Sequence, residues 1–328
     1  MRKVLLGRTG LEISELAFGG GVTGGILINA DEPTRYNALK RAVEAGINWI
    51  DTAPIYGSGE SERTIGRHWQ SLSSGLNIST KVRLEAGDVN DISGAIERSL
   101  EQSLERLRAS SIALLQLHNH LGRGVGERLA LTPAQVLGRG AVADTFDRLK
   151  EQGLIRAAGM TAAGETQACL QVIESGRFDT AQVYYNAVNP SAAMRRLPDG
   201  WNGGQDFCGV LAACLRQNLG ALNIRVWAGG VLALQKPPER LFVMTSDTDL
   251  ANEVRCGAAV RKALAQEGTP AHAALRFVLG NRDFASRVIG ISTIEQLDAA
   301  LDALARGPLP PGAVSKLEAL WANGFSGA

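Results

Sequence analysis

Residues 47–62 read Ile47-Asn-Trp-Ile-Asp51-Thr-Ala-Pro-Ile-Tyr56-Gly57-Ser-Gly59-Glu-Ser61-Glu62. The short apolar run at 47–51 predicts a buried strand that ends on a carboxylate, and a glycine-rich loop with a tyrosine follows it. A helical pattern then continues from Glu62 to Gln70. This order of strand, loop and helix is the unit from which parallel α/β folds are built.

The same unit recurs along the whole chain of 328 residues. Most strand candidates are rich in Ile, Val and Leu with little alternation, which is typical of parallel strands covered on both faces. The candidates are Ser14–Phe18, Ile47–Asp51, Leu76–Val82, Ile112–Leu117, Ile155–Gly159, Asp179–Tyr184, Asn223–Ala228 and Arg287–Gly290. Helical patterns occupy 31–45, 62–70, 91–107, 141–152, 165–175, 206–218, 252–266, 271–279 and 294–305. Eight strands, each followed by a helix, predict one α/β domain over residues 1–328, a (β/α)8 TIM barrel; a Rossmann domain with a second domain is the competing fold.

Three connections are unusually long: His120–Gly140, Asn186–Gln205 and Leu234–Leu250. They follow the fourth, sixth and seventh predicted strands. In a barrel the loops that follow strands open on the active-site face, and loops of this length are often functional. We therefore expect long loops on the C-terminal face of the barrel.

Composition and charge exclude several classes of protein. The 34 Lys and Arg nearly balance the 33 Asp and Glu, so the chain lacks the positive footprint of a nucleic-acid or membrane-surface protein. The polar N-terminus predicts neither a signal peptide nor an anchor, and no apolar run is long enough to span a bilayer. The four cysteines lack C-x-x-C spacing and are expected to be reduced thiols. We expect a cytoplasmic protein with a small-molecule partner, as a monomer or a weak homo-oligomer.

Polar side chains stand at successive predicted strand ends. Asp51 ends the second strand, Lys81 the third and His118 the fourth, while Tyr56 follows Asp51 in the glycine-rich loop. Because the strand ends of a barrel converge on one rim, these four side chains are expected in a single cleft. A strand-terminal Asp or Lys alone is usually a cap or a solvated end, but four such residues together predict a site.

The four side chains suit proton transfer to an oxygen atom. A phenol ordinarily ionises only near about pH 10, and an adjacent ammonium such as Lys81 favours the phenolate. Asp51 would hold that ammonium in place, and His118 could donate a hydrogen bond that polarises a carbonyl. No side chain donates hydride, so the reduction of a carbonyl also implies a nicotinamide cofactor.

Motifs in the expected order carry a resemblance to a known family. They are Leu6-Gly-Arg-Thr-Gly-Leu11 with Ile13-Ser14, the run 51–62, Lys81, His118, Gly153-x-Ile155-Arg156-x-x-Gly159 and Gln182-Val-x-Tyr185-Asn186. Over nearly its whole length the chain resembles the aldo-keto reductases. The resemblance implies an N-terminal β-hairpin below the barrel and Tyr56 as the general acid/base. It also implies Lys81 as the partner of Tyr56, Asp51 as the orienting residue, and His118 as the residue that orients the substrate carbonyl.

The same resemblance implies a site for NADPH or NADH. Gln182 matches the glutamine that binds the carboxamide, and Thr161-Ala162 stands where the family has Ser-Asn. Trp227 is placed where a tyrosine ends the seventh strand and stacks on the nicotinamide. The run Ala228-Gly229-Gly230 replaces Ser-Pro-Leu, and its amides could approach the pyrophosphate. The backbone of the first loop, at Gly20 and Gly21, is expected close to the nicotinamide.

The region for the cofactor's 2′-phosphate departs from the family. It runs from Gly290 through Ser292 to Gln296, and residues 290–297 contain no Lys or Arg. Members selective for NADPH carry a cation here, because a dianionic phosphate normally requires one. Arg287, before the motif, is the nearest basic residue. Ser292 and Gln296 are the expected hydrogen-bonding contacts, and dual use or a preference for NADH stays open.

Two motifs suggest other chemistry. Residues 19–24 match G-x-G-x-x-G, but the helical pattern begins only near Asp31, which argues against a Rossmann site. His118-Asn-His120 resembles a metal-ligand pair, yet His68 and His272 fall in helical patterns, so no metal is expected.

We therefore expect an NAD(P)(H)-dependent oxidoreductase that acts on a carbonyl or alcohol substrate. Reduction of an aldehyde or ketone is the first choice of direction. Oxidation of a sugar-like hemiacetal or a secondary alcohol gains weight if NAD is preferred. The alternative is a regulatory or redox-sensing barrel that binds nicotinamide but turns over little, as in barrels related to potassium-channel β-subunits.

Overall fold

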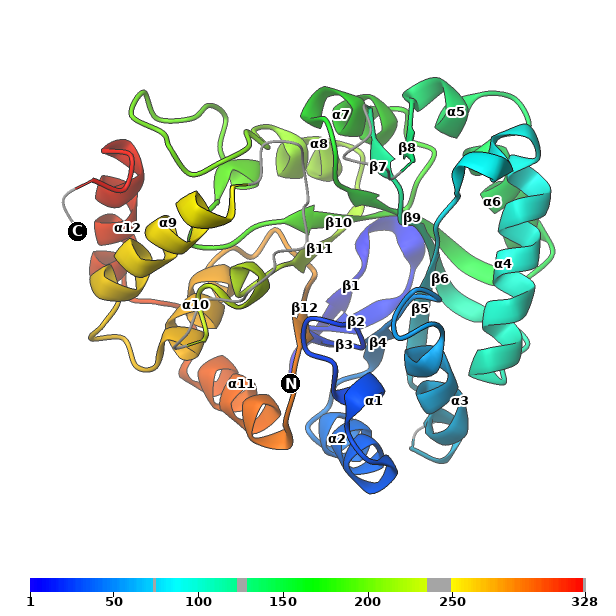
Figure 1. Cartoon of the computed structure of the whole chain (residues 1–328), viewed down its shortest axis with the longest axis horizontal. Coiled ribbons are helices and arrows are strands. Elements are labelled where there is room, and N and C mark those ends of the chain that lie inside the picture. Colours follow the sequence, from blue (N-terminus) through cyan, green and yellow to red (C-terminus); the bar gives the residue numbers. More distant parts are fainter. Residues whose placement is uncertain (73–74, 123–128, 235–248, 327–328) are drawn as a thin grey trace.

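Eight parallel strands close into a barrel in the computed structural model, which describes residues 1–72, 75–122, 129–234 and 249–326 (Figure 1). Around the barrel the strands follow one another in the order β10, β11, β12, β3, β4, β5, β6 and β9. Their bounds are β3 Leu16–Gly19, β4 Trp49–Asp51, β5 Asn77–Val82, β6 Ile112–Leu117, β9 Ile155–Ala162, β10 Thr180–Tyr184, β11 Gly220–Ile224 and β12 Ser286–Gly290. The predicted (β/α)8 fold is confirmed.

Helices surround the barrel and return the chain to the start of each strand (Figure 1). The long ones are α2 Glu32–Glu44, α3 Glu60–Leu72, α4 Ile92–Leu107, α6 Val142–Glu151, α7 Thr166–Glu174, α8 Val210–Arg216, α9 Leu250–Ala263, α10 Pro270–Leu279 and α11 Ile294–Arg306. Asp31 begins α2 by accepting a hydrogen bond from the Thr34 N–H, and Pro33 lies in the first turn. Asp91 caps α4 in the same way through the N–H of Gly94. Both starts agree with the sequence pattern.

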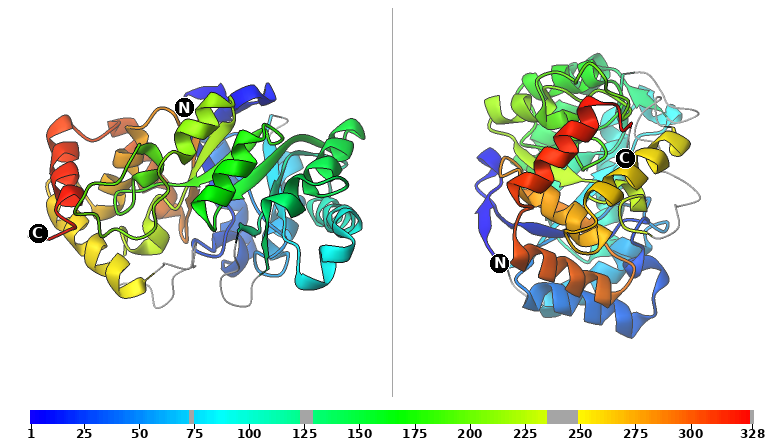
Figure 2. Two further views of the ribbon diagram at one scale, coloured as in Figure 1. Left: turned by 90° about the horizontal axis from the view of Figure 1, so that it is seen from above. Right: turned by 90° about the vertical axis from the view of Figure 1, so that its left-hand side faces the viewer.

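The C-terminal helix α12, Pro311–Ala322, was not predicted from the sequence. Figure 2 shows it against α9 on the outside of the barrel. The Trp321 indole N–H donates to the Ala187 carbonyl at 3.0 Å. Helix α12 therefore anchors the loop after β10.

An antiparallel hairpin of β1, Lys3–Leu5, and β2, Glu12–Ser14, covers the amino-terminal end of the barrel, and the 3₁₀ turn η1, Gly7–Thr9, joins its strands (Figure 2). Leu6, Leu11 and Ile13 pack into one buried cluster with the inward-facing Trp49 of β4. Gly7 has φ +52°, and a Cβ there would lie 2.2 Å from the Gly220 nitrogen. The hairpin can thus approach β11 only with glycine at this position.

Two of the three long connections lie largely within the described residues. The one at 120–140 is less irregular than expected, with short strands β7 His120–Leu121 and β8 Ala130–Leu131 and helix α5 Pro133–Leu137. The one at 186–205 contains only the 3₁₀ turn η3 Ser191–Ala193. Most of the third connection, 235–248, lies outside the described residues. Two other short helices, α1 Ile26–Asn29 and η2 Ala86–Asn90, follow β3 and β5.

The predicted bounds of the seventh barrel strand, Asn223–Ala228, are wrong. Strand β11 ends at Ile224, and Arg225 adopts a left-handed backbone conformation with φ +61°. The 3₁₀ turn η4, Ala228–Gly230, follows with Trp227 at its start. Apolar residues after the strand continue the hydrophobic run, so the pattern does not mark where β11 stops.

Candidate active site

A buried ion pair connects β4 and β5 at the carboxyl end of the barrel. The Lys81 Nζ lies 2.6 Å from the Asp51 Oδ2 and 2.7 Å from the Thr52 carbonyl oxygen. Burial on its own lowers the pKa of Lys81, but the neighbouring Asp51 and Tyr56 outweigh it and raise the pKa above its ordinary value. Lys81 is therefore a fixed, protonated cation.

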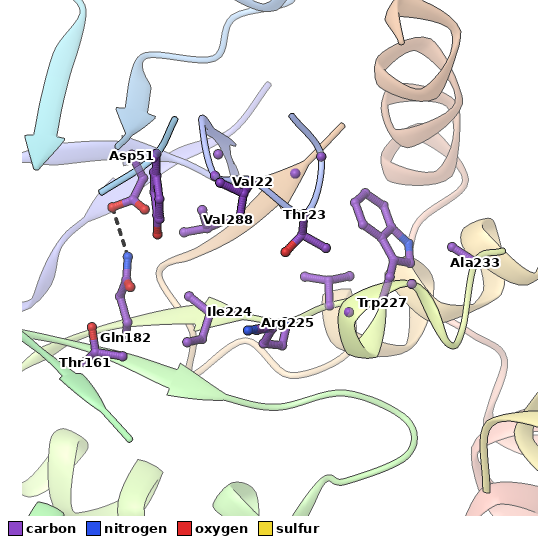
Figure 3. Close-up of a pocket in the computed structure, with 18 of the residues that line it drawn as sticks. Val22, Thr23, Asp51, Thr161, Gln182, Ile224, Arg225, Trp227, Ala233 and Val288 are labelled. Carbon is purple, nitrogen blue, oxygen red and sulfur yellow. Dashed lines mark hydrogen bonds between the residues drawn. The ribbon is translucent and has the colours of Figure 1, made fainter. Parts of the chain in front are cut away.

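The other oxygen of Asp51 accepts hydrogen bonds from three strands. Its Oδ1 lies 2.8 Å from the Ser79 Oγ, 2.9 Å from the Gln116 Nε2 and 2.9 Å from the Gln182 Nε2. Figure 3 shows the bond between Asp51 and Gln182. These three donors hold the Asp51 carboxylate in one orientation beside Lys81.

Sequence reasoning missed Ser79 and Gln116. Ser79 precedes Lys81 by two residues, and Gln116 precedes His118 by two residues. Because side chains in a strand alternate between its faces, each points to the same side as the predicted site residue that follows it. That two-residue spacing was the signal that could have identified them.

Tyr56 is brought back to the barrel rim by a tight turn after β4, in which its N–H donates to the Ala53 carbonyl at 3.1 Å. The Lys81 Nζ lies 4.9 Å from the centre of the phenol ring. The His118 ring meets Tyr56 edge-on, with 5.8 Å between ring centres. The structure thus brings the four predicted residues Asp51, Tyr56, Lys81 and His118 together.

A cavity of about 680 Å³ opens above these residues (Figure 3). Most of the predicted site residues line it: Asp51, Tyr56, His118, Gly21, Thr161, Gln182, Trp227, Gly290, Ser292 and Gln296. Lys81 lies beneath the wall that Asp51 and Tyr56 form. Gly20 and Ala228 are not among the lining residues. A Cβ on Gly20 would lie 2.4 Å from the Ser61 Oγ, which shows that this glycine serves close packing.

The expected place of Trp227 is also corrected. Ile224, not Trp227, ends β11, and Trp227 stands three residues later in the cavity wall. Figure 3 shows it at the far end of the cavity from Asp51. Its indole N–H donates to the Ala271 carbonyl at 3.0 Å. This bond fixes the ring against α10.

Thr161 and Gln182 are neighbours across β9 and β10, and both line the cavity beside Asp51 (Figure 3). Thr161 is 5% exposed, and its hydroxyl has no hydrogen-bond partner among the described residues. A buried hydroxyl without a partner is costly unless a ligand completes it. The hydroxyl together with the amide of Gln182 fits a ligand with both donor and acceptor atoms, such as the carboxamide of a nicotinamide.

At the start of α11, backbone N–H groups donate to side chains of the same segment. The Ser292 N–H donates to the Gln296 Oε1 at 2.8 Å, and Thr293 caps the helix through the Gln296 N–H at 3.3 Å. Exposed Glu295 adds a negative charge in the first turn. Arg287 is buried and donates to the carbonyls of Val278 and Phe284 at 3.1 and 3.2 Å. Burial lowers the pKa of Arg287 to about 10.

The three residues of the segment His118-Asn119-His120 have different surroundings. The Asn119 side chain bridges to the backbone of Leu84, while His118 and His120 face the cavity. Within residues 1–72, 75–122, 129–234 and 249–326, no group of three or more His, Cys, Asp or Glu could hold a metal ion. Across the same ranges, none of the helices combines the length and apolar character that crossing a bilayer requires.

The barrel and the site define a class of protein, and the sequence comparison identifies it: the chain belongs to the aldo/keto reductase family, whose sequence model matches residues 15–322. L-galactose dehydrogenase of Arabidopsis thaliana is 25% identical over 96% of this chain and 92% of its own length. The uncharacterized oxidoreductase YrpG of Bacillus subtilis is 28% identical over 93% and 91%. The resemblance predicted from the motifs is confirmed, and the chain is an oxidoreductase of a family that uses NAD(P)H.

Two further comparisons are with a solved structure and with a protein named as a potassium channel subunit. The holo form of aldo-keto reductase AKR11C1 from Bacillus halodurans superposes with a TM-score of 0.73 at 21% identity, covering 98% of this chain and 97% of that one. This similarity supports the fold. A putative voltage-gated potassium channel subunit beta of Schizosaccharomyces pombe is 36% identical over 121 residues, about a third of each chain.

Proposed function

We propose that this protein transfers hydride reversibly between a nicotinamide cofactor and a carbonyl or alcohol substrate, with Tyr56 as the general acid/base. One observation carries the proposal: the Lys81 ammonium, held by Asp51, lies 4.9 Å from the centre of the Tyr56 ring. A fixed cation beside a phenol stabilises the phenolate, so the phenol can give up and regain a proton.

Tyr56, Lys81 and His118 have different roles in the proposed proton transfer. When bound, the cofactor supplies or accepts hydride at the nicotinamide C4. During reduction, the Tyr56 hydroxyl donates its proton to the substrate oxygen, and Lys81 stabilises the phenolate that remains. During oxidation, the phenolate takes the proton back from the substrate hydroxyl. His118, edge-on to Tyr56 in the cavity wall, donates a hydrogen bond to the same oxygen.

The cofactor contacts proposed from the sequence follow the cavity wall. Thr161 and Gln182 would hold the carboxamide, because their polar groups meet beside Asp51. Gly21 would lie along the nicotinamide. A Cβ on this residue would lie 3.5 Å from the Tyr56 ring, at van der Waals contact, so Gly21 stands directly beside the phenol in the cavity wall.

We propose NADH as the preferred cofactor. Gln296 already uses its carbonyl oxygen on the Ser292 N–H, and Glu295 places a negative charge at the same helix start. Both features disfavour a dianionic 2′-phosphate. Arg287 is committed to backbone carbonyls inside the fold and does not replace the missing cation.

With NAD, the oxidation of a sugar-like hemiacetal or a secondary alcohol becomes the favoured direction. The relative named L-galactose dehydrogenase supports a sugar as the substrate class. The cavity of about 680 Å³ is of a size typical for sites of small molecules.

The test measures cofactor binding and turnover separately. NADH and NADPH binding are followed by tryptophan fluorescence, since Trp227 lines the cavity. Turnover is assayed with aldoses plus NAD and with aromatic aldehydes plus NADH. Tyr56→Phe should lose at least about 100-fold in kcat while its NADH Kd stays within twofold, because only the proton donor is removed.

Two results would contradict this proposal. Full activity of Tyr56→Phe would remove the phenol from the mechanism. Tight NADH binding without turnover on any carbonyl or alcohol would favour the regulatory barrel instead.

A further inference from the structure

Arg83 stands in the cavity wall at the carboxyl-terminal end of the barrel. It is the first residue after β5, and it lines the cavity together with His118 and Asn119. Because side chains two residues apart on a strand share a face, Arg83 lies on the same side as Lys81 and about 7 Å further towards the rim. A positive charge is therefore placed a short distance from the proposed reaction centre.

The backbone on both sides of Arg83 is fixed by the end of the neighbouring strand β6. The His118 N–H donates to the Val82 carbonyl at 2.8 Å. The Asn119 side chain accepts from the Leu84 N–H and donates to the Leu84 carbonyl, both at 2.8 Å. A side chain on a backbone held in this way is preorganised, which is what a binding residue requires. The same bonds tie the position of Arg83 to that of His118.

The ion pair that Arg83 forms leaves most of its donors unused. Its Nη2 lies 2.9 Å from the Glu85 Oε1, and the two side chains are 27% and 61% exposed. Pairs this exposed are weak, because water and salt screen them. Nε and Nη1 have no partner in the part of the chain that the structure describes. Glu85 is also not among the described residues that line the cavity, so a ligand can reach the guanidinium from within.

The cavity wall contains no carboxylate that would compete for Arg83. Among the described lining residues, Asp51 is the only Asp or Glu, and it is paired with Lys81 at 2.6 Å. A guanidinium in a cleft whose one carboxylate is already neutralised attracts an anionic group of the ligand.

We propose that Arg83 forms a subsite for an anionic group of the substrate, a carboxylate or a phosphate carried a few bonds away from the reacting carbon. The planar guanidinium makes two parallel hydrogen bonds with either anion. Tyr56 and His118 would hold the reacting oxygen while Arg83 holds the other end. The substrate class is therefore an acidic alcohol or hemiacetal, or the matching carbonyl. The inference rests on the proposed function, because that function places the reacting oxygen beside Tyr56.

Three alcohols built on one aromatic ring test the subsite. The compound 4-(hydroxymethyl)benzoate carries a carboxylate, 4-(hydroxymethyl)phenyl phosphate carries a phosphate, and 4-(hydroxymethyl)benzamide is the neutral match for the benzoate. Each is titrated into the NADH-saturated protein by calorimetry. Because NADH already carries its hydride, the alcohol is not oxidised in this complex and the Kd needs no turnover. We expect the wild type to bind at least one of the two acids about tenfold more tightly than the amide.

Four variants separate charge, geometry and general electrostatics. Arg83→Gln removes the charge, and Arg83→Lys keeps the charge without the paired donors. Glu85→Gln removes the counter-charge at the rim. Arg98→Gln is the matched control, since Arg98 forms a similar exposed pair with Asp91, at 3.1 Å, and does not line the cavity. Circular dichroism and thermal unfolding establish that each variant is folded.

Arg83→Gln should weaken the better-bound acid about tenfold and leave the amide and NADH within about twofold. Arg83→Lys should fall between the wild type and Arg83→Gln. Glu85→Gln should tighten the acid, because a competing carboxylate is removed. The acid that responds more strongly identifies the anion as carboxylate or phosphate.

Three results would overturn the subsite: a wild type that binds the amide as tightly as both acids, a folded Arg83→Gln that binds both acids unchanged, or an equal loss in Arg98→Gln or Glu85→Gln. Failure of the proposed function looks different. A protein that catalyses no reaction would refute hydride transfer, yet the difference between acid and amide, and its loss in Arg83→Gln, would still be measured.

Discussion

The Lys81 ammonium lies 2.6 Å from the Asp51 Oδ2, and the two side chains are 1% and 6% exposed. An ion pair this deeply buried costs desolvation energy, which its mutual attraction and further hydrogen bonds must offset. Here the Thr52 carbonyl accepts from Lys81, and the Ser79 hydroxyl is one of three donors to Asp51. The ion pair between Lys81 and Asp51 therefore affects both the stability of the fold and the proposed proton transfer.

Removing one charge of this pair should cost more stability than removing both. Asp51→Asn leaves the Lys81 ammonium buried without its counter-charge, and we expect the free energy of unfolding to fall by about 3–5 kcal/mol. The double variant Asp51→Asn/Lys81→Met should recover part of that loss but remain inactive. Urea denaturation and kcat measure the two effects. Equal stability of the single and double variants would contradict the coupling.

Gln116 should act as a positioning residue for Asp51. Its Nε2 donates to the Asp51 Oδ1 at 2.9 Å, while its own Oε1 is buried without a partner in the described part of the chain. We expect Gln116→Met to lower kcat about 3- to 10-fold and to shift the pH profile of kcat. Stability should change by less than about 1 kcal/mol, because the unsatisfied carbonyl is removed with the donor.

Thr180→Val is the matched control for Gln116→Met. Thr180 also carries a buried hydroxyl without a partner among the described residues, but it donates nothing to Asp51. This variant should leave kcat and its pH profile unchanged. If both variants lower kcat alike, the effect of Gln116 is general to the barrel interior.

Arg287 should matter for stability and not for the choice of cofactor. Arg287→Met removes a buried guanidinium that donates to the carbonyls of Val278 and Phe284, so the free energy of unfolding should fall by about 2 kcal/mol or more. The ratio of the NADPH and NADH dissociation constants should stay within twofold. Gln296→Arg is the contrasting variant and should tighten NADPH at least tenfold. A selective loss of NADPH binding in Arg287→Met would show that Arg287 reaches the phosphate.

Because of Glu253, the free energy of unfolding should decrease as the pH rises. Its pKa is raised from 4.5 to about 7, mainly by burial, so the folded state holds a proton that the unfolded state releases. The stabilisation is fully present below about pH 4.5 and is lost as the pH rises through about 7. Asp249 adds to the shift and Arg225 opposes it.

Glu253→Gln isolates this effect. The difference in unfolding free energy, variant minus wild type, should become more favourable to the variant between pH 5 and pH 8, by on the order of 1–3 kcal/mol. Urea titrations at both pH values provide the measurement. Carboxylates elsewhere contribute equally to both proteins and cancel in the difference. A difference that does not change with pH would mean that Glu253 titrates normally.

The sequence predicted the barrel because each strand is a short apolar run between helices with clear starts, such as the cap at Asp31. Strand β6 was predicted at its observed bounds, Ile112–Leu117. The predicted end of β11 was wrong because Arg225 ends the strand with a left-handed backbone conformation. Hydrogen bonds from Asn186 and Ala228 to the Arg225 carbonyl impose this conformation. No local pattern records a constraint that comes from another loop.

The sequence by itself determined the barrel class and which residue types stand at the strand ends, because apolar periodicity and motif spacing are local properties of the chain. Only the tertiary structure decided which neighbours complete the site. It placed Ser79, Gln116 and Gln182 on one oxygen of Asp51, and it moved Trp227 from the strand end to the far wall. It also set Arg225 in the cavity. These relationships depend on closing the barrel, which brings together side chains that the sequence keeps up to 131 residues apart.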